Sequence, residues 1–530
     1  MTNPRLGWLA LALVSFLAQT PSRTDTARAQ SAPRPAASAA PAARYRVKLK
    51  VEEKLWDVSM TVTLRKAAPL ELWIPRWTPG AYHLADFAKY VKELSATDAS
   101  GKPLKVKQNS PVVSWEIDPG VATEVEIRYV GTPTSEGPLG PILELEGSRI
   151  AAGRAYLTPC SLLAFVPALQ NLPVEVTLEL PPGWKVATAL DRRDDGTYTA
   201  PSYLRLEDSP FLMGRRLAVE TFEAAGAIHE VAALGKSEEE LKPIAEDCKK
   251  IVEAASRMMG GLPYKRYVFL FGFGSGGSGG LEHSYSTLIL LPNGIPQSEL
   301  LHVIAHEFFH LWNAERIHVE GIEHPDLTKP FTTGTIWLNE GGTEYVSSLL
   351  LVAAGLQSEK QFFRGLARNY AMVSAPGMRE MLTKRSWLEV SKAFTNASME
   401  DFMELVLTHY QEGSVVLFAL DLEMRKASGG ERGVPDLIRY LFENYAKKGR
   451  GYGENELPTI LSKVAGADLS GFYDKYIAGP DQVDLSKFVG VIGLRFETSD
   501  NAYEAKLVDV EKPTPEQLAM RKKLFAIGKP

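Results

Sequence analysis

The chain has 530 residues, of which 45% are hydrophobic and 23% are charged, and its formal net charge is -5. This length exceeds one ordinary hydrophobic core and indicates about three domains, while the composition is typical of a soluble globular protein. A negative net charge argues against a nucleic-acid partner. The two cysteines, Cys160 and Cys248, are too far apart for a CxxC metal site or a disulfide framework. They form either one disulfide or two separately buried thiols.

The amino terminus has the pattern of an export signal. Arg5 precedes an apolar run from Leu6 to Ala18, and Ala27-Arg28-Ala29 follows as an A-x-A cleavage pattern. The run is shorter than the roughly 20 apolar residues of a membrane span, so an uncleaved anchor is the less favoured alternative. We therefore expect a signal peptide over residues 1–29, an Ala/Pro-rich linker over 30–44, a periplasmic or secreted protein, and no stable membrane span after cleavage.

Hydrophobic periodicity changes twice along the rest of the chain. Short alternating segments such as YRVKLKVE predict an amino-terminal β-sandwich-like domain over 45–225. Mixed strand and helix patterns predict an α+β domain over 226–355, and amphipathic helices a helical domain over 356–490. Residues 491–530 form a short tail. The fold class is multidomain α+β. Within the β domain, the segment from Pro75 to Ala88 is interpreted as a rigid, aromatic-packed loop that carries Trp77 and Tyr82.

A glycine-rich stretch follows the strand pattern RYVFLFGF. Gly272, Gly274 and Gly277 spell GxGxxG, the fingerprint of dinucleotide binding. That fingerprint needs a helix immediately afterwards, whereas Leu281-Glu282-His283 leads into a second apolar strand pattern. We therefore reject the nucleotide interpretation and expect a close-approaching backbone beside a substrate cleft, with Glu282 displayed on an edge strand.

The histidines indicate the chemistry. His302, His306 and His310 recur every fourth residue in a predicted helix and so share one face. Two of them flank Glu307 in HEFFH, which is H-E-x-x-H: both histidines bind zinc and the glutamate deprotonates the attacking water. The motif also occurs by chance in structural helices. Here the apolar neighbours would bury these polar groups, which is costly without a metal. His302 is expected to pack or face solvent.

A catalytic zinc needs a third protein ligand. Asn313 and Arg316 stand where a metzincin would have Gly and His, so that class is excluded. A second helix, predicted to begin near Asn339 after a strand-like entry, places Glu340 and Glu344 on one face. Glu340 is the preferred ligand, and Glu344 is a candidate to support a liganding histidine from behind. Lower-ranked loop alternatives are His318, His324, Glu320 and Glu323.

Four motifs together resemble the glycyl aminopeptidase family of gluzincin zinc peptidases. They are GGLEH (279–283), HEFFHLWN (306–313), NEG.T.Y (339–345) and Y.EG (410–413). The segment PRWTPGAYHLADFA is similar to that family's amino-terminal domain and GRGYGENEL to its helical domain. The resemblance covers roughly residues 45–494.

This resemblance implies a thermolysin-like catalytic domain with one Zn²⁺ per chain. His306, His310 and Glu340 would be the ligands and Glu307 the general base. Glu282 would anchor the free amino group of a peptide, and Gly279 and Gly280 of the same motif would also contact substrate. Tyr410 would stabilise the oxyanion. Without the resemblance, Tyr410 would be interpreted as a buried aromatic residue of a helix.

Some features depart from the family pattern. Glu315 stands where the family usually has a basic residue, and the residues after Leu494 are too few for the usual carboxy-terminal PDZ domain. We expect a zinc aminopeptidase that removes small residues, Gly or Ala, from peptides with a free amino terminus. The alternatives are a zinc endopeptidase or other hydrolase on the same site, and a catalytically inactive peptide-binding protein.

Overall fold

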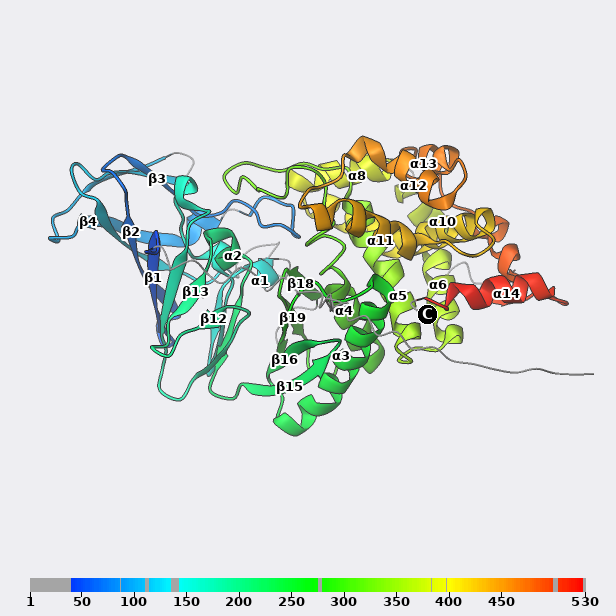
Figure 1. The fold of residues 1–530 in the computed structure, drawn as a ribbon, viewed down its shortest axis with the longest axis horizontal. Coiled ribbons are helices and arrows are strands. Elements are labelled where there is room, and N and C mark those ends of the chain that lie inside the picture. The colour runs from blue at the N-terminus through cyan, green and yellow to red at the C-terminus, as the bar shows by residue number, and fades with distance from the viewer. Residues whose placement is uncertain are drawn as a thin grey trace, which may run out of the picture. The chain divides into compact units, whose positions relative to one another are not determined.

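A computed structural model describes residues 40–85, 87–109, 114–134, 143–274, 279–382, 384–396, 398–498 and 504–527. By its contacts the chain divides into two units, Met1–Ala40 and Pro41–Pro530. The predicted signal peptide and most of the predicted linker lie outside the described residues. Figure 1 follows the second unit from its amino-terminal strands to its carboxy-terminal helix.

The described residues of the amino-terminal region form a seven-stranded sheet in the order β12-β13-β10-β1-β2-β7-β4. In β1 and β2, buried and exposed residues alternate, because successive side chains of a strand point to opposite faces. The pair β1 and β10 is parallel, and the other pairs are antiparallel. The strands are β1 (Ala43–Lys50), β2 (Leu55–Thr63), β4 (Val91–Asp98), β7 (Glu124–Gly131), β10 (Val174–Glu179), β12 (Asp191–Arg192) and β13 (Tyr198–Ala200).

Two smaller sheets complete this region within the described ranges. One has the order β3-β6-β5 and the other β11-β14-β9-β8. Tryptophans and tyrosines fill the shared core, among them Trp56, Trp77 and Tyr203. The elements are β3 (Leu70–Trp73), β5 (Lys105–Gln108), β6 (Ser114–Asp118), β8 (Arg149–Ala151), β9 (Arg154–Leu157), β11 (Lys185–Ala187), β14 (Phe211–Gly214), the 3₁₀ turns Phe87–Tyr90, Pro159–Ser161 and Pro167–Leu169, and the helices α1 (Leu143–Glu146) and α2 (Tyr203–Glu207).

The next sheet supports the site. Its order is β15-β16-β17-β19-β18, from β15 (Ala218–Ala224), β16 (Ala227–Leu234), β17 (Arg266–Phe273), β19 (Ser286–Leu291) and β18 (Gly279–His283). The strands β16, β17 and β19 run parallel and are almost entirely buried, which explains their continuous apolar sequences. The edge strand β18 pairs antiparallel with β19. As expected, a strand follows the glycine-rich stretch, which argues against the dinucleotide fingerprint.

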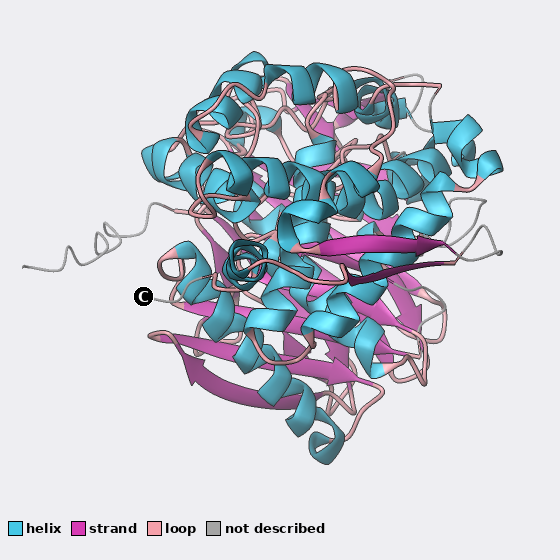
Figure 2. Cartoon of the chain, turned by 90° about the vertical axis from the view of Figure 1, so that its right-hand side faces the viewer, coloured by secondary structure: helices cyan, strands magenta, loops and turns pink. Residues whose placement is uncertain are grey.

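Helices α3 (Glu238–Met259) and α4 (Gln297–Phe309) accompany this sheet, and the chain then becomes helical (Figure 1). Figure 2 shows helices gathered in the upper part of its view and strands mainly in the lower part. The predicted strand-like entry to Glu340 is wrong, because a π-helical turn over Trp337–Gly341 leads directly into α5. A second π-helical segment, Val406–Glu412, leads into α10. The helices are α5 (Gly342–Ala353), α6 (Glu359–Ser374), α7 (Pro376–Leu382), α8 (Trp387–Ala393), α9 (Met399–Leu405), α10 (Gly413–Ala427), α11 (Val434–Asn444), α12 (Leu457–Ala465) and α13 (Ser470–Tyr476).

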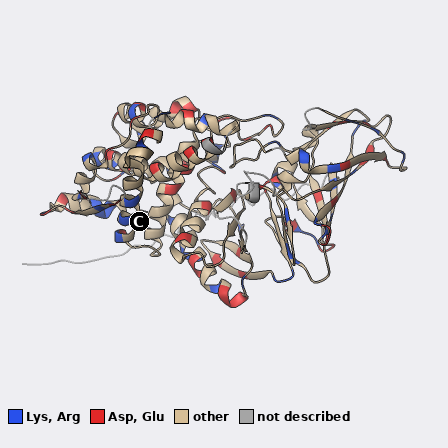
Figure 3. Ribbon diagram, turned by 180° about the vertical axis from the view of Figure 1, so that it is seen from behind, with Lys and Arg blue, Asp and Glu red and all other residues tan. Residues whose placement is uncertain are grey.

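The tail contains β20 (Leu494–Thr498) paired with β21 (Ala505–Asp509), and the helix α14 (Pro515–Leu524). Arg521 of α14 donates to the carbonyls of Ile492 and Gly493, so the tail is fastened to the helical region. Acidic and basic residues are interspersed among the elements (Figure 3). Among the described residues, no helix is long and apolar enough to cross a membrane. Cys160 and Cys248 are both buried and free.

Candidate metal centre and active site

Helix α4 presents the three residues of the HExxH motif. It begins after Pro296, and its apolar residues, such as Ile304 and Phe308, are fully buried against the sheet and neighbouring helices. His306 and Glu307 lie in its last turn, and His310 caps its carboxyl end. All three are at least 93% buried, with exposed fractions of 5%, 7% and 1%.

Three ligand atoms converge in front of this turn. The Nε2 atoms of His306 and His310 are 2.9 Å apart, and each lies 3.4 Å from Oε2 of Glu340. Ligands bound tetrahedrally at about 2.0–2.2 Å from zinc are separated by about 3.3 Å. Oε2 of Glu340 is buried and has no hydrogen-bond partner in the described part of the chain. The triangle therefore has the size and donor set that a zinc ion requires.

The far side of each imidazole is held in place. Nδ1 of His306 contacts Oε2 of Glu344 at 3.2 Å, and Nδ1 of His310 contacts the carbonyl of Asn313 at 2.8 Å. With Nδ1 donating to these oxygens, the lone pair of each Nε2 points to the metal position. Glu344 thus lies where a supporting residue is expected. His302, expected to pack or face solvent, is partly exposed and also contacts Glu344, at 3.0 Å.

The charge balance of the centre favours a cation. Burial raises the pKa of Glu307 to about 7, although the two histidines oppose the shift. Burial alone would lower the pKa of His310, but the carboxylates of Glu282 and Glu340 outweigh it and raise that pKa to about 9. Buried carboxylates therefore outnumber buried imidazoles in this poorly solvated space. A dication bound by His306, His310 and Glu340 would supply the missing positive charge.

Strand β18 brings Glu282 to the same place. Carboxylate oxygens of Glu282 and Glu307 and a ring nitrogen of His310 all lie within 4.8 Å of one another. Oε1 of Glu282 is buried and has no hydrogen-bond partner among the described residues. Gly280 shares its face of the strand, and a Cβ there would stand 2.3 Å from Cγ of Glu307. Gly280 thus lets the strand approach α4 closely, and Glu282, two residues further on, presents its carboxylate from the same face.

A loop of the amino-terminal domain completes the site, which sequence reasoning did not anticipate. The loop is aromatic-packed as predicted, since Trp77 stacks on Phe331 at 5.6 Å. Its next residues reach the metal centre: a Cβ on Gly80 would lie 2.7 Å from Oε1 of Glu282, and Asn339 donates to the hydroxyl of Tyr82 at 2.8 Å. Tyr82 adopts φ 58°, which is unusual for a residue with a side chain. The local sequence of this loop predicts its packing but not its approach to Glu282 and Asn339, which lie far away in the chain.

Glu146, at the end of α1, adds a second carboxylate to the cavity that Glu282 lines, and the sequence did not predict it. Its Oε1 lies 3.5 Å from Nε2 of His83, and its Oε2 is buried without a hydrogen-bond partner in the described ranges. Burial raises the pKa of Glu146, His83 lowers it, and the carboxylate of Glu282 raises it further. Glu146 and Glu282 line the same cavity, so both carboxylates are available to one cationic group bound there.

Tyr410 lies beside the candidate metal centre. Its ring stacks on that of His306, with centroids 5.5 Å apart and an interplanar angle of 20°. Burial and then the carboxylate of Glu340 hold the pKa of Tyr410 well above its usual value, so its hydroxyl keeps a proton to donate. The π-helical turn that carries it abuts the π-helical turn that carries Glu340. A Cβ on Gly413 would stand 2.9 Å from Cα of Gly341.

These groups surround one cavity of about 500 Å³. Its walls include the metal centre, Glu282, Glu146, Tyr82 and Tyr410, and also Gly279 and Gly280. The lower-ranked ligand candidates lie elsewhere: the candidate metal groups among the described residues do not include His318, His324, Glu320 or Glu323. Glu315 accepts a hydrogen bond from Ser284 at 2.6 Å, and burial holds its pKa well above the usual range.

Comparisons with known proteins agree with this geometry. The model of the peptidase M61 N-terminal domain matches residues 44–215, and the model of M61 glycyl aminopeptidase matches residues 299–416. No curated protein matches the chain.

Solved structures share the fold. An aminopeptidase N family protein from Idiomarina loihiensis is 24% identical, with TM-score 0.78, covering 86% of this chain and 79% of its own. An M1 zinc metallopeptidase from Deinococcus radiodurans is 16% identical, with TM-score 0.53 and coverages of 84% and 94%. Yeast LTA4 hydrolase is 15% identical, with TM-score 0.54 and coverages of 85% and 69%. On the two domain matches and this fold, the chain belongs to the peptidase M61 glycyl aminopeptidase family and is a zinc metallopeptidase.

Proposed function

We propose that the protein is an aminopeptidase that binds one Zn²⁺ per chain through His306, His310 and Glu340. The observation that carries this proposal is the carboxylate of Glu282, which lies within 4.8 Å of groups of Glu307 and His310 and whose Oε1 has no hydrogen-bond partner among the described residues. A carboxylate so close to the reacting centre leaves room for one residue between an ammonium group and the scissile carbonyl. This arrangement favours removal of the first residue of a peptide.

Each residue has one task in the proposed reaction. The zinc, when bound, polarises the scissile carbonyl and lowers the pKa of water. Glu307 takes the proton of the attacking water and passes it to the leaving amine. Tyr410 donates its hydroxyl proton in a hydrogen bond to the oxygen on which negative charge develops. Glu282, with Glu146 beside it, holds the α-ammonium.

The substrate class follows from the family and from the cavity. The matching family is described as glycyl aminopeptidase, which supports a small first residue, Gly or Ala. Tyr82 and Glu146 line the cavity near Glu282 and limit the space beside the ammonium group. We further propose that the protein is exported, because Arg5, the apolar run to Ala18 and Ala27-Arg28-Ala29 form a signal peptide pattern.

The test compares glycyl substrates that carry a free or an acetylated amino terminus. Purified wild-type protein should contain one zinc per chain and cleave the free substrate about 100-fold faster or more. Glu282→Ala should retain zinc and lose most of this preference, because its carboxylate pairs with the ammonium but does not bind the metal. Equal cleavage of both substrates would instead support an endopeptidase. Bound peptide without any cleavage would support the inactive binding protein.

A further inference from the structure

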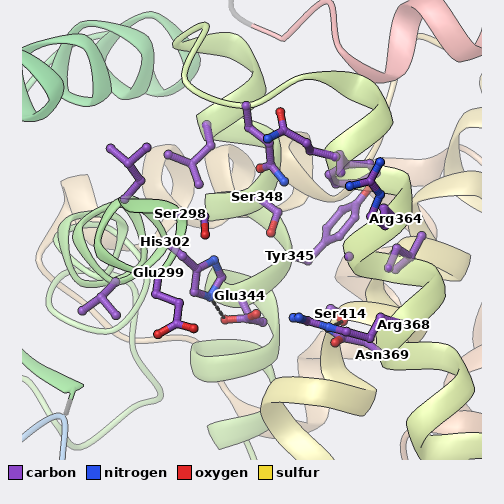
Figure 4. A pocket seen from close by; sticks show the side chains of 18 of the residues that line it. Ser298, Glu299, His302, Glu344, Tyr345, Ser348, Arg364, Arg368, Asn369 and Ser414 are labelled. Carbon is purple, nitrogen blue, oxygen red and sulfur yellow. Dashed lines mark hydrogen bonds and ion pairs between the residues drawn. The ribbon is translucent and has the colours of Figure 1, made fainter. Parts of the chain in front are cut away.

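A second cavity of about 570 Å³ adjoins the catalytic cavity. It lies between α4, α5 and α6, and the two cavities share His302, Val303, Glu344 and Gln411 as wall residues. Figure 4 shows it from close by, with the His302–Glu344 contact at its centre. Because the shared residues border both spaces, a chain that leaves the metal centre past His302 enters the second cavity.

The direction of a bound peptide follows from α4. Glu282 lies near Glu307 and His310, at the carboxyl end of this helix, whereas His302 lies one turn before His306 toward its amino end. A peptide with its amino terminus at Glu282 and its first carbonyl at the metal centre already occupies the space at the carboxyl end of α4. Its remaining residues must therefore run toward His302 and the second cavity.

Two arginines line that cavity on the far side. Arg364 and Arg368 are one turn apart on α6, both are exposed, and neither pairs with a carboxylate in the described part of the chain. Figure 4 shows them across the cavity from His302. Like charges at i and i+4 repel each other on a helix, and an anion between them relieves the repulsion. The planar guanidinium is also the side chain best suited to a carboxylate.

The other charged groups on the cavity wall leave the arginines available. Glu344 is engaged by both His302 and His306, at 3.0 and 3.2 Å. Glu299 lies on α4, beside His302 and across from the arginines (Figure 4). Gln357 and Gln411 each have a buried side-chain oxygen without a hydrogen-bond partner among the described residues, and such oxygens accept hydrogen bonds from peptide N–H groups.

We propose that this cavity holds the part of the peptide beyond the scissile bond, and that Arg364 and Arg368 bind its terminal carboxylate. The inference rests on the proposed aminopeptidase function and names its substrates: short peptides with both termini free. Binding at both ends selects a narrow range of lengths, because one carboxylate must reach the arginines while the ammonium stays at Glu282.

The experiment uses full-length, zinc-loaded protein and glycine-initiated peptides of increasing length, from dipeptides upward, each as free acid and as carboxy-terminal amide. At the preferred length, wild-type protein should cleave the acid with a kcat/KM about tenfold higher than the amide, mainly through KM. Arg364→Ala and Arg368→Ala should each reduce this ratio, and the double variant should bring it to about one. Lys360→Ala is the matched control, because it removes an exposed positive charge from α6 outside the cavity wall.

A wild-type ratio near one at every length, or a ratio that persists in the double variant, overturns the inference. Hydrolysis of glycine p-nitroanilide by wild-type protein separates the two proposals, because this substrate ends before the second cavity. If the anilide is cleaved and the acid-to-amide ratio of kcat/KM is near one at every peptide length, only the carboxylate site is rejected. If neither the anilide nor any peptide is cleaved, the aminopeptidase proposal fails and this inference fails with it.

Discussion

Carboxylates dominate the candidate site at the scale of single residues. Glu282, Glu307 and Glu340 are all more than 90% buried, with exposed fractions of 4%, 7% and 5%. Charges in such a place are costly unless paired. Glu340 faces the two histidines, Glu307 has a raised pKa, and one oxygen of Glu282 has no hydrogen-bond partner in the part of the chain that the structure describes. These different surroundings support the three roles that we propose for three chemically identical groups: ligand, base and anchor.

Glu307→Gln tests the base. The amide keeps the shape of the side chain but cannot accept a proton, so turnover should fall about 100- to 10,000-fold while zinc content stays at one per chain. Metal analysis and kcat on glycine p-nitroanilide measure the two effects. Glu246→Gln, on the exposed face of α3, is the control and should change neither. Near-normal turnover of the Glu307 variant would mean that another group takes the proton.

Tyr410→Phe tests the oxyanion donor. The hydroxyl is used mainly in the transition state, so kcat should fall by the roughly 2.7–4 kcal/mol that one such donor contributes, with little change in KM. The stacking of this ring on His306 is kept by phenylalanine, so zinc content should not change. If kcat and KM both stay at wild-type values, Tyr410 is only a packing residue.

At the scale of elements, two π-helical turns position side chains of the candidate site. One carries Glu340 and the other carries Tyr410, and they meet where the backbones of Gly341 and Gly413 approach each other. A π-helical turn inserts a residue into a helix and changes the direction of the side chains near it. The glycine contact therefore sets how closely the turn of Tyr410 approaches the turn of Glu340.

Gly413→Ala should separate these two turns, because the added methyl group would stand 2.9 Å from Cα of Gly341. We expect kcat to fall at least about tenfold, since small displacements of catalytic groups are costly. Gly471→Ala in α13 is the control: it is also helical, and its Cβ would meet no atom within 4 Å. Unchanged kcat in the Gly413 variant would show that the contact is tolerant.

At the scale of the whole molecule, local patterns predicted more than long-range contacts. Spacing within one helix grouped His306, Glu307 and His310, and the succession of strand and helix patterns predicted the α+β fold class. Tyr82 and its partner Asn339 are 257 residues apart, so no periodicity connects them. Glu146 was missed for the same reason. The π-helical turn at Glu340 was read as a strand entry, because short apolar runs do not distinguish strand from helix.

Acid stability is a property of the whole fold that one buried histidine should influence. His229 of β16 is fully buried, stacks on Phe222 at 4.7 Å and contacts the hydroxyl of Tyr264 at 2.8 Å. Burial lowers its pKa to about 4 from the ordinary 6.5. The folded state therefore disfavours the protonated form, and stability present above about pH 6.5 should be lost as the pH falls toward 4, by up to about 3 kcal/mol.

Urea unfolding at pH 7 and at pH 4.5 measures this loss for wild-type protein and His229→Leu. The leucine variant should lose less stability between the two values, whatever its stability at pH 7. His324→Leu, which removes an exposed imidazole, should leave the difference unchanged. If the free energy of unfolding falls by the same amount between pH 7 and pH 4.5 in all three proteins, groups other than His229 cause the acid sensitivity.

The loop that carries Gly80 and Tyr82 has a consequence for the order of assembly. It belongs to the β domain, which is synthesised before β18 and the turn of Glu340, yet Gly80 approaches Glu282 of β18 and Tyr82 accepts a hydrogen bond from Asn339 of that turn. During synthesis the β domain can fold first and wait as a preformed wall for the rest of the site. The proposed anchor for the substrate's amino terminus is complete only after the later segments pack against that domain. Activity should therefore appear only after the last of these segments has folded.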